Sequence, residues 1–304
     1  MTGIGRRLLL LVPTVLGVLT LVFLLVHLIP GDPVEVMLGE TASRADLQQL
    51  RHDLGLDRPL GQQYLRFLGG LGRGDLGHSY FYRKPVLAVI GAALPATAQL
   101  AAAALAVALL IALPLGILAA VRRDRLADRL TLIGSLAGIS MPNFWLGPLL
   151  IILFSFRLGW LPVSGREGAA SLVLPAATLG MALAAILVRM TRASMLDVLG
   201  EEYLRTARAK GVGERAVIAR HALRNALLPV VTIVGLQFGA LLSGAVVTEN
   251  VFSWPGVGTL LIQAITARDY PLVQGCVLVI SLCYVAVNFL TDALYSVIDP
   301  RVRT

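Results

Sequence analysis

The chain has 304 residues, of which 57% are hydrophobic and 14% are charged, and its mean hydropathy is +0.79. Soluble domains carry about 25% charged residues, so the composition excludes an ordinary soluble domain and predicts an integral membrane protein. The formal net charge of +8 does not indicate a nucleic-acid-binding domain, because the basic residues alternate with long apolar runs.

The first apolar run, residues 8–29, follows Arg6 and Arg7 and in this respect resembles a secretory signal. The run is longer than the apolar region of a signal peptide, and the sequence HLIPGDP that ends it offers no small-x-small cleavage site. We therefore expect residues 1–29 to form a cytoplasmic N-terminus and a retained first transmembrane helix.

Charge-free stretches further along predict five more spans, since an ionised arginine at mid-bilayer costs about 2.5 to 3.5 kcal/mol on insertion scales. Each stretch can supply the ~20 apolar residues that cross a hydrocarbon core about 30 Å thick. Helices are expected, because period-two alternation is absent and lipid offers the backbone no hydrogen-bond partner. The sequence thus predicts an all-α membrane protein with six transmembrane helices. The five later helices are expected at about 97–121, 132–156, 172–191, 227–249 and 273–296.

Arginine and lysine counts predict the orientation of the chain. If the N-terminus is cytoplasmic, the segments that lie inside hold 16 basic residues and the short outer loops hold three. The segment 30–93 is discounted, because long loops cross the membrane with little regard to charge. We expect an extracytoplasmic segment at 30–93, with an amphipathic portion around 60–71, a transmembrane domain at 94–298, and a cytoplasmic tail at 299–304.

Cysteine and histidine spacing gives no sign of a disulfide or a metal site. Cys276 and Cys283 lie seven residues apart in one apolar run, about 10 Å along a helix axis, which is too far for a bond. We interpret both as core residues. The four histidines lie on different segments, so no metal site is expected.

A charged insert, EEYLRTARAKGVGERAVIARHALRN at residues 201–225, separates the fourth and fifth predicted spans. Its apolar and basic residues alternate in an amphipathic pattern, and the GVG at 211–213 breaks the run, which predicts two short helices joined there. Such an element lies along the membrane surface. Composition alone leaves open whether the insert anchors to anionic lipid or binds a protein.

The insert resembles the cytoplasmic loop of ABC-transporter permeases, whose EAA motif reads E-A-A, three residues, G, nine residues, I-x-L-P. Ala207, Gly211 and Leu223 match this general pattern, and the other motif positions depart from it. The surrounding form, E-Y-x-R-T-A-R-A-K-G followed by R-H-x-L-R-N-A-x-x-P, is similar to the permeases of dipeptide, oligopeptide and nickel importers. The motifs HLIPGDP, SMPNFWLG, ENVFSWPGVG, RDYPLVQG and DALYSVIDPRVR resemble members of this branch in the same order along the chain.

The resemblance implies the type I ABC importer permease fold, with a coupling-helix loop at 196–226. It also implies the partners: a second homologous permease, two ATPase subunits, an extracytoplasmic substrate-binding protein and membrane lipid, with no nucleic acid. Of the two lysines, Lys84 and Lys210, neither follows the G-x-x-x-x-G of a phosphate-binding loop. We therefore expect no enzymatic activity and no cofactor on this chain, with ATP and Mg used by the partner ATPases. The expected location is a bacterial or archaeal inner membrane.

By resemblance, the insert docks into a cleft of the ATPase and couples ATP hydrolysis to the spans. Gly211 permits the left-handed backbone of a sharp turn, and Val217 and Leu223 are expected to fill the partner's groove. The expected ATPase-coupling residues are Glu202, Tyr203, Arg205, Ala207, Arg208, Gly211, Arg220, His221, Leu223 and Asn225.

Polar residues inside apolar spans usually face the bundle interior, because an uncompensated amide in hydrocarbon is costly. Each can also serve a helix–helix hydrogen bond. The candidates for the translocation path are Gln99, Asn143, Gln237, Ser243 and Asn288. ENVFSWPGVG is expected to form an outer turn with Phe252 and Trp254 at the level of the lipid headgroups. The candidates for an outer gate or a binding-protein docking site are Glu249, Phe252, Trp254, Pro255 and Gly256.

These observations favour the permease of an ATP-driven importer for di- and oligopeptides that works by alternating access. Within the same family, a nickel-chelate or glutathione importer is the alternative. A secondary transporter is disfavoured by the absence of an inverted repeat. An intramembrane hydrolase using Ser243 is disfavoured because no histidine lies within a span, apart from His27 near an outer end.

Overall fold

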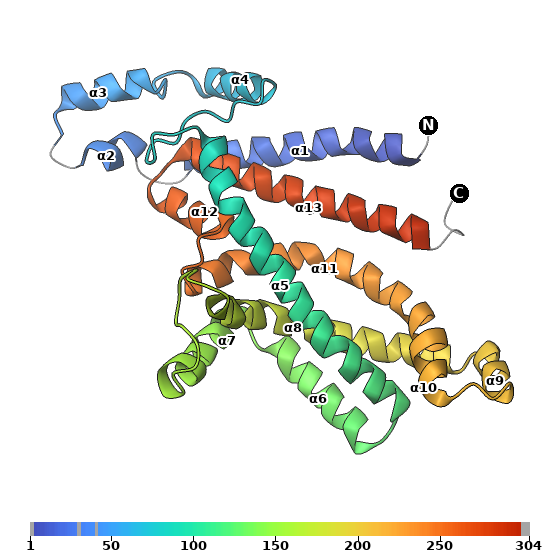
Figure 1. Cartoon of the computed structure of the whole chain (residues 1–304). Helices are drawn as coiled ribbons and strands as arrows, with labels where there is room; N and C mark the ends of the chain where they lie inside the picture. The colour runs from blue at the N-terminus through green and yellow to red at the C-terminus, as the bar shows by residue number, and fades with distance from the viewer. Residues whose placement is uncertain (1–2, 29–31, 40–41, 299–304) are drawn as a thin grey trace. The chain divides into compact units, whose positions relative to one another are not determined.

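Helices make up almost all of the regular structure in the computed structural model of the chain (Figure 1). The structure describes residues 3–28, 32–39 and 42–298, so the predicted cytoplasmic tail at 299–304 lies outside the described residues. Within these ranges no strand forms, and His78 and Pro85 make only an isolated bridge. The prediction of an all-α protein is therefore confirmed.

Four helical stretches of the described residues are long and apolar enough to cross a membrane, and a bent pair of helices is a fifth candidate. The four stretches lie in α5 (Val86–Val121), in α8 (Ala170–Leu199), across α10 and α11 (Glu214–Ala216 and Leu223–Val251), and in α13 (Tyr270–Ile298). The first predicted span corresponds to α1 (Gly3–Leu28), within which Val15–Leu24 is an apolar helical segment.

The predicted span at 132–156 is not one straight helix. It consists of α6 (Leu126–Ser140) and α7 (Asn143–Leu150), followed by a π-helical segment, η1 (Ile151–Arg157), with a bend of 105° at the break. Met141 and Pro142 form that break, and their backbones are extended. Proline disfavours the helical conformation of the residue before it, so the helix ends where Pro142 follows.

The described chain forms two compact units. The first unit comprises Met1–Thr97 and Pro255–Val285, and the second comprises Ala98–Trp254 and Ala286–Thr304. The core of the first unit joins apolar residues of α1, α5, α12 (Val257–Thr266) and α13. Gly275 permits the close approach of α13 to α5, because a Cβ there would lie 2.4 Å from Cγ1 of Val86.

Two helix N-termini of the first unit are capped by side chains: Asp269 directly precedes α13, whereas Thr97 lies 160 residues from the start of α12. Asp269 accepts the backbone N–H of Leu272 at 3.2 Å, the Ser79 hydroxyl at 2.5 Å and the Phe81 N–H at 3.1 Å. Thr97 Oγ1 accepts the N–H of Val257 at 2.8 Å. Because Asp269 is fully buried, these bonds satisfy a group whose burial is otherwise costly.

The long segment between α1 and α5 forms α2 (Pro33–Leu38), α3 (Arg44–Asp53) and α4 (Leu60–Leu71). Asp32 caps α2 and forms an ion pair with Arg51 of α3, and Ser43 caps α3. Hydrogen bonding to Asp32 raises the pKa of Arg51. The helix α4 has the bounds of the predicted amphipathic portion.

The second unit is organised around α8, which packs against α6, α7 and α11 (Figure 1). Small residues bring α5 and α8 close together: a Cβ on Gly180 would lie 2.6 Å from the carbonyl oxygen of Ala104, and one on Gly116 would lie 2.6 Å from Cβ of Thr191. Such contacts are typical of helix packing in membranes. The charged insert, residues 201–225, lies in this unit.

Candidate functional site: a basic hairpin and the ion pair between α6 and α8

The insert at 201–225, here called the basic hairpin, folds on a buried apolar cluster. Its helix α9 (Glu202–Ala209) contributes Leu204, and the π-helical segment η2 (Val217–Ala222) contributes Val217; both side chains are fully buried. They pack with Met195 at the end of α8 and Ala120 at the end of α5. Each such burial contributes about 1.5 to 3 kcal/mol, so the hairpin is held as a folded element.

The turn of the hairpin is a helix C-cap centred on glycine. Gly211 has φ +81, its N–H donates to Arg208 O at 2.9 Å, and Val212 N–H donates to Ala207 O at 3.2 Å. This pair of bonds defines the Schellman motif, which needs a left-handed residue after the helix. After the turn the chain does not form a separate second helix as predicted, because α10, η2 and α11 follow one another without a break.

Two polar contacts close the hairpin at its surface. Arg208 donates to both carboxylate oxygens of Glu214 at 3.0 and 2.9 Å, and this bonding raises the pKa of Arg208. Asn225 Nδ2 donates to the hydroxyl of Tyr203 at 2.7 Å, and that hydroxyl donates to the carbonyl of His221 at 3.4 Å. Exposed pairs of this kind contribute about 0 to 1 kcal/mol, so they set the shape of the hairpin more than its stability.

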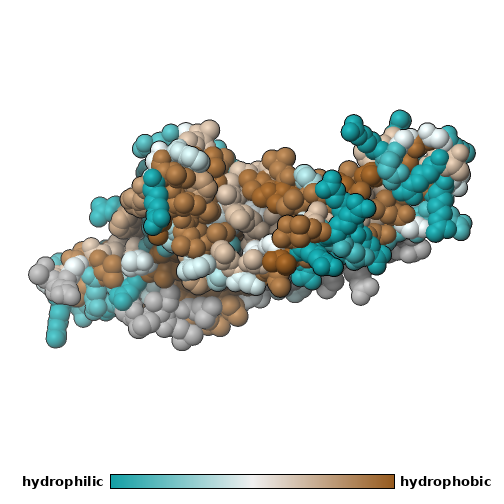
Figure 2. Space-filling model, turned by 90° about the horizontal axis from the view of Figure 1, so that it is seen from below, coloured by the Kyte–Doolittle hydropathy of each residue, from teal (hydrophilic) through white to brown (hydrophobic). Residues whose placement is uncertain are grey.

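Most of the predicted coupling residues are exposed on the hairpin. Figure 2 shows hydrophilic side chains gathered towards the right, where α9 and α10 lie in Figure 1. The exposed coupling residues are Glu202, Tyr203, Arg205, Arg208, Gly211, Arg220 and Asn225. Ala207, His221 and Leu223 are half-buried. The expectation that Val217 fills a partner's groove is wrong, because its side chain is fully buried within the hairpin's own core.

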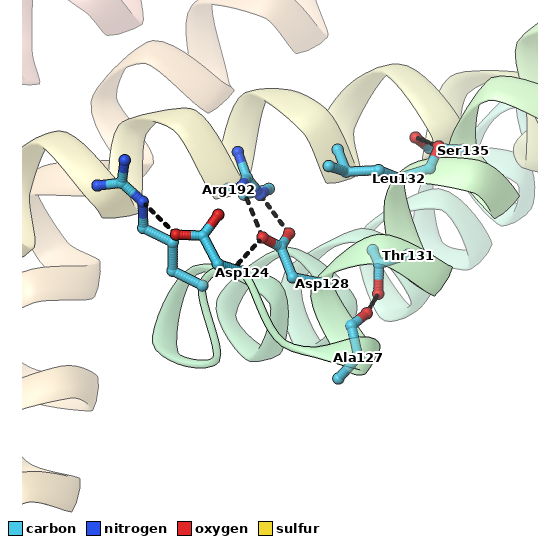
Figure 3. Close-up of polar contacts among 8 residues, drawn as sticks. Asp124, Ala127, Asp128, Thr131, Leu132, Ser135 and Arg192 are labelled. Atoms are coloured by element: carbon cyan, nitrogen blue, oxygen red, sulfur yellow. Dashed lines mark hydrogen bonds and ion pairs between the residues drawn. The ribbon is translucent and has the colours of Figure 1, made fainter.

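A buried ion pair that sequence reasoning missed joins α6 to α8 (Figure 3). Arg192 Nε and Nη2 donate to the two carboxylate oxygens of Asp128 at 2.5 and 2.7 Å. Asp128 also accepts the N–H of Asp124 at 3.0 Å, in the turn that precedes α6. The side chains of Asp128 and Arg192 are 3% and 20% exposed. The partners lie 64 residues apart, and Asp128 belongs to the charged stretch RRDRLADR, so no local pattern indicated the pair.

The predicted path residues lie in the second unit, on α5, α7, α11 and α13. Gln99 is exposed and accepts two hydrogen bonds from Arg166, at 3.1 and 2.8 Å. Among the described residues, Oδ1 of Asn143 is buried without a partner, and no hydrogen bond joins any two of the candidates. Gln237 and Asn288 are half-buried, and Ser243 lies in α11 with its side chain outside the described residues. Their role in a path stays a prediction.

The predicted outer turn places its aromatic rings in the interior. Phe252 and Trp254 are 1% and 0% exposed, so neither ring faces outward as a membrane anchor, and their level relative to the headgroups stays a prediction. Phe252 packs with Ile151 and Leu174, and the Arg166 guanidinium carbon lies 5.7 Å from the centre of the Trp254 ring. Glu249 and Gly256 are buried and Pro255 is exposed. An outer gate at these residues stays a prediction.

Fold and site together define a class of protein: a helical membrane protein with several spans and a structured basic hairpin between two of them. Comparison with known sequences gives the family. The family model described as "Binding-protein-dependent transport system inner membrane component" matches residues 112–304, and the model of its N-terminal part matches residues 2–101. The chain belongs to this family of inner-membrane transport components.

Curated relatives match over nearly the whole chain. A glutathione transport system permease protein, GsiC, of Pectobacterium atrosepticum is 47% identical over 98% of this chain and 97% of its own length. A di/tripeptide transport system permease protein, DppB, of Pseudomonas aeruginosa is 47% identical over 99% of this chain and 98% of its own length. The predicted identity as an ABC importer permease is confirmed, and the chain is a transport component, not an enzyme.

Solved structures share the fold. The MetNI methionine ABC transporter matches with a TM-score of 0.56 at 17% identity, over 70% of this chain and 97% of that chain. An amino acid ABC transporter matches with a TM-score of 0.51 at 16% identity, over 70% of this chain and 94% of that chain. The permease works with ATPase subunits, which use ATP, and with a substrate-binding protein, as the family description implies.

Proposed function

We propose that this chain is the permease of an importer for short peptides, and that it carries them across the membrane by alternating access. The observation that carries the proposal is the 47% identity to a di/tripeptide permease over 99% of the chain. Because the binding protein of such a system meets the substrate first, the permease passes on what that protein delivers.

The alternative substrate is glutathione, which is itself a tripeptide. It is favoured by the equal identity, 47%, to a glutathione permease over 98% of the chain. The ligand that copurifies with the partner binding protein distinguishes the two. A peptide mixture supports our proposal, whereas glutathione alone supports the alternative and a nickel chelate contradicts both.

The basic hairpin is the proposed contact with the ATPase. The exposed arginines belong to a hairpin whose buried Leu204 and Val217 pack against the rest of the unit. A displacement of the hairpin by the ATPase is therefore transmitted to the ends of α8 and α11. Ser194 of α8 adds a direct link, because its hydroxyl donates to the carbonyl of Ala226 in α11 at 2.9 Å. In this arrangement ATP and Mg bind the ATPase pair, and a second, homologous permease completes the path.

The proposed orientation places both termini and the hairpin in the cytoplasm, since the hairpin carries the densest group of basic residues. The segment 30–93 then faces the outside. Transmembrane domain 94–298 contains the path, for which Gln99, Asn143, Gln237, Ser243 and Asn288 remain the candidates, and the residues from Glu249 to Gly256 are proposed for the outer gate.

Photo-crosslinking tests the hairpin contact. A benzoyl-phenylalanine placed at exposed Arg205 is expected to crosslink the ATPase subunit in membranes of cells that express the whole importer. The matched control places the same group at Arg44, exposed on α3 in the proposed outer segment. Crosslinks from position 205 that reach only lipid, or an ATPase adduct from position 44, would contradict the proposed coupling.

A further inference from the structure

The first unit contains a cavity of about 1020 Å³ that the transport mechanism described above does not use. Its walls come from the end of α1, from α3 and α4, from the loop at 73–83 and from the first turn of α13. Every lining residue belongs to this one unit. The volume matches the upper end of the range for small-molecule sites, about 300 to 1,000 Å³.

Three polar side chains on the cavity wall lack a protein partner. Gln274 and Tyr270 of α13 are 7% and 9% exposed, and Tyr80 is half-buried. Across the described parts of the chain, neither the amide of Gln274 nor the hydroxyls of the two tyrosines make a hydrogen bond within the protein. Their polar atoms are not among the fully enclosed atoms that lack a partner in the described chain, so they open onto the cavity and are available to a molecule inside it.

Charge also gathers at the cavity. The lining includes four arginines and two aspartates: Arg58, Arg66, Arg73, Arg83, Asp53 and Asp75. None of the four arginines forms an ion pair with a described residue, whereas Arg51, outside the cavity, pairs with Asp32. The cavity therefore carries unpaired positive charge together with a smaller negative charge.

Arg66, exposed like the other three arginines of the lining, lies close to Gly55 and acts on Tyr80. Its Nη1 is 3.1 Å from the position that a Cβ on Gly55 would occupy, and its charge acts on Tyr80. Burial raises the pKa of Tyr80 to about 12, so its hydroxyl stays neutral and can both donate and accept at any physiological pH. A guanidinium beside neutral hydroxyls suits a carboxylate, which accepts from both.

The apolar part of the wall is ordered by its own contacts. The rings of Phe23 and Phe67 are stacked with centroids 6.1 Å apart, and His27 lies 5.4 Å from Tyr270. Gln63 holds this wall to the neighbouring loop, because its amide donates to Arg58 O at 2.8 Å while its Oε1 lies 3.2 Å from His27 Nε2. A ligand thus meets preformed rings on one side and free polar groups on the other.

We propose that this cavity binds a short peptide, with its terminal carboxylate on Arg66 and its amide groups on Gln274 and the two tyrosines. The aspartates accept its terminal ammonium group, and the aromatic wall contacts its side chains. A zwitterion with a polar backbone matches this mixture of both charge signs, hydroxyls and an amide. The proposal rests on the proposed peptide transport and adds a binding site on the permease itself.

Equilibrium dialysis of the full chain in lipid nanodiscs tests the site, with radiolabelled Ala-Ala as the probe. Arg66→Gln is expected to weaken binding about tenfold or more, because a charge-assisted bond is lost. Ala-Ala amide, which lacks the carboxylate, is expected to bind the unaltered chain as weakly as Ala-Ala binds Arg66→Gln. On Arg66→Gln itself, the two peptides should bind alike.

Gln274→Leu gives a second variant of similar size that leaves the arginines in place, and it is also expected to weaken Ala-Ala binding. The matched control, Arg44→Gln, removes an exposed arginine of the same segment that does not line the cavity, and should bind Ala-Ala normally. Equal binding of the acid and the amide, or no binding of Ala-Ala, would overturn the proposal. Binding of glycerophosphoglycerol without any binding of Ala-Ala would assign the arginines to lipid headgroups and overturn it as well.

The transport proposal is judged separately. If the whole importer takes up Ala-Ala but the chain in nanodiscs does not bind it, the proposed function stands and the proposed binding site is contradicted. If the chain binds Ala-Ala but the whole importer does not take it up, the binding site stands and the proposed function is contradicted.

Discussion

Gly211 is the residue on which the shape of the basic hairpin depends. Its φ of +81 suits glycine, and its N–H donates to Arg208 O at 2.9 Å. Proline fixes φ near −65° and has no N–H, so Gly211→Pro loses both the turn and the bond, at a cost of about 0.5 to 3 kcal/mol. We expect the variant to insert into the membrane while ATP hydrolysis becomes uncoupled from uptake, as measured in proteoliposomes of the whole importer.

Gly213, two residues further on, is the matched control. Its φ of −62 suits proline, and within the described chain its N–H donates to no acceptor. Gly213→Pro should therefore retain coupled uptake. Coupled uptake by Gly211→Pro, or an equal loss of uptake in both variants, would show that coupling does not depend on the turn geometry at Gly211.

At the scale of elements, Asp128 and Arg192 fix α6 to α8 beside the turn that ends α5. The pair is largely buried, so removing one partner leaves an uncompensated charge, at a cost of about 3 to 5 kcal/mol. We expect Asp128→Asn and Arg192→Gln each to lower the melting temperature of the purified chain. The melting temperature of the double variant should fall by less than the sum of the two single effects, because either substitution alone already breaks the ion pair.

Arg189→Gln serves as the control for this pair, since Arg189 is exposed on the same helix and has no ion pair with a described residue. Its melting temperature should stay close to that of the unaltered chain. Strictly additive losses in the Asp128 and Arg192 variants would mean that the contact in Figure 3 does not link the helices.

The same elements show what sequence patterns can and cannot predict. The amphipathic helix α4 and the glycine turn at 211 follow from local spacing, so their positions were predictable. The pair Asp128–Arg192 and the burial of Trp254 depend on segments distant in sequence that meet only in the folded unit. Likewise, the cavity polar groups Tyr80 and Gln274 lie almost 200 residues apart, and no periodicity connects them.

At the scale of the whole molecule, two lysines can be used to determine the orientation of the chain in the membrane. Of its 26 basic residues, only Lys84 and Lys210 are lysines, and both are exposed. Lys84 precedes α5 in the proposed outer segment, and Lys210 caps α9 in the hairpin. In the proposed orientation these two amines therefore lie on opposite sides of the membrane.

An amine-reactive reagent that does not cross membranes tests this arrangement in intact spheroplasts. We expect labelling at Lys84 alone, with labelling at Lys210 only after the membrane is permeabilised, as read by peptide mass spectrometry. Lys84→Arg keeps the charge and should abolish labelling of the chain in intact spheroplasts, whereas Lys210→Arg should leave that labelling unchanged. Labelling of Lys210 in intact spheroplasts would invert the orientation, and the hairpin would then lie on the side of the membrane where no ATPase can reach it.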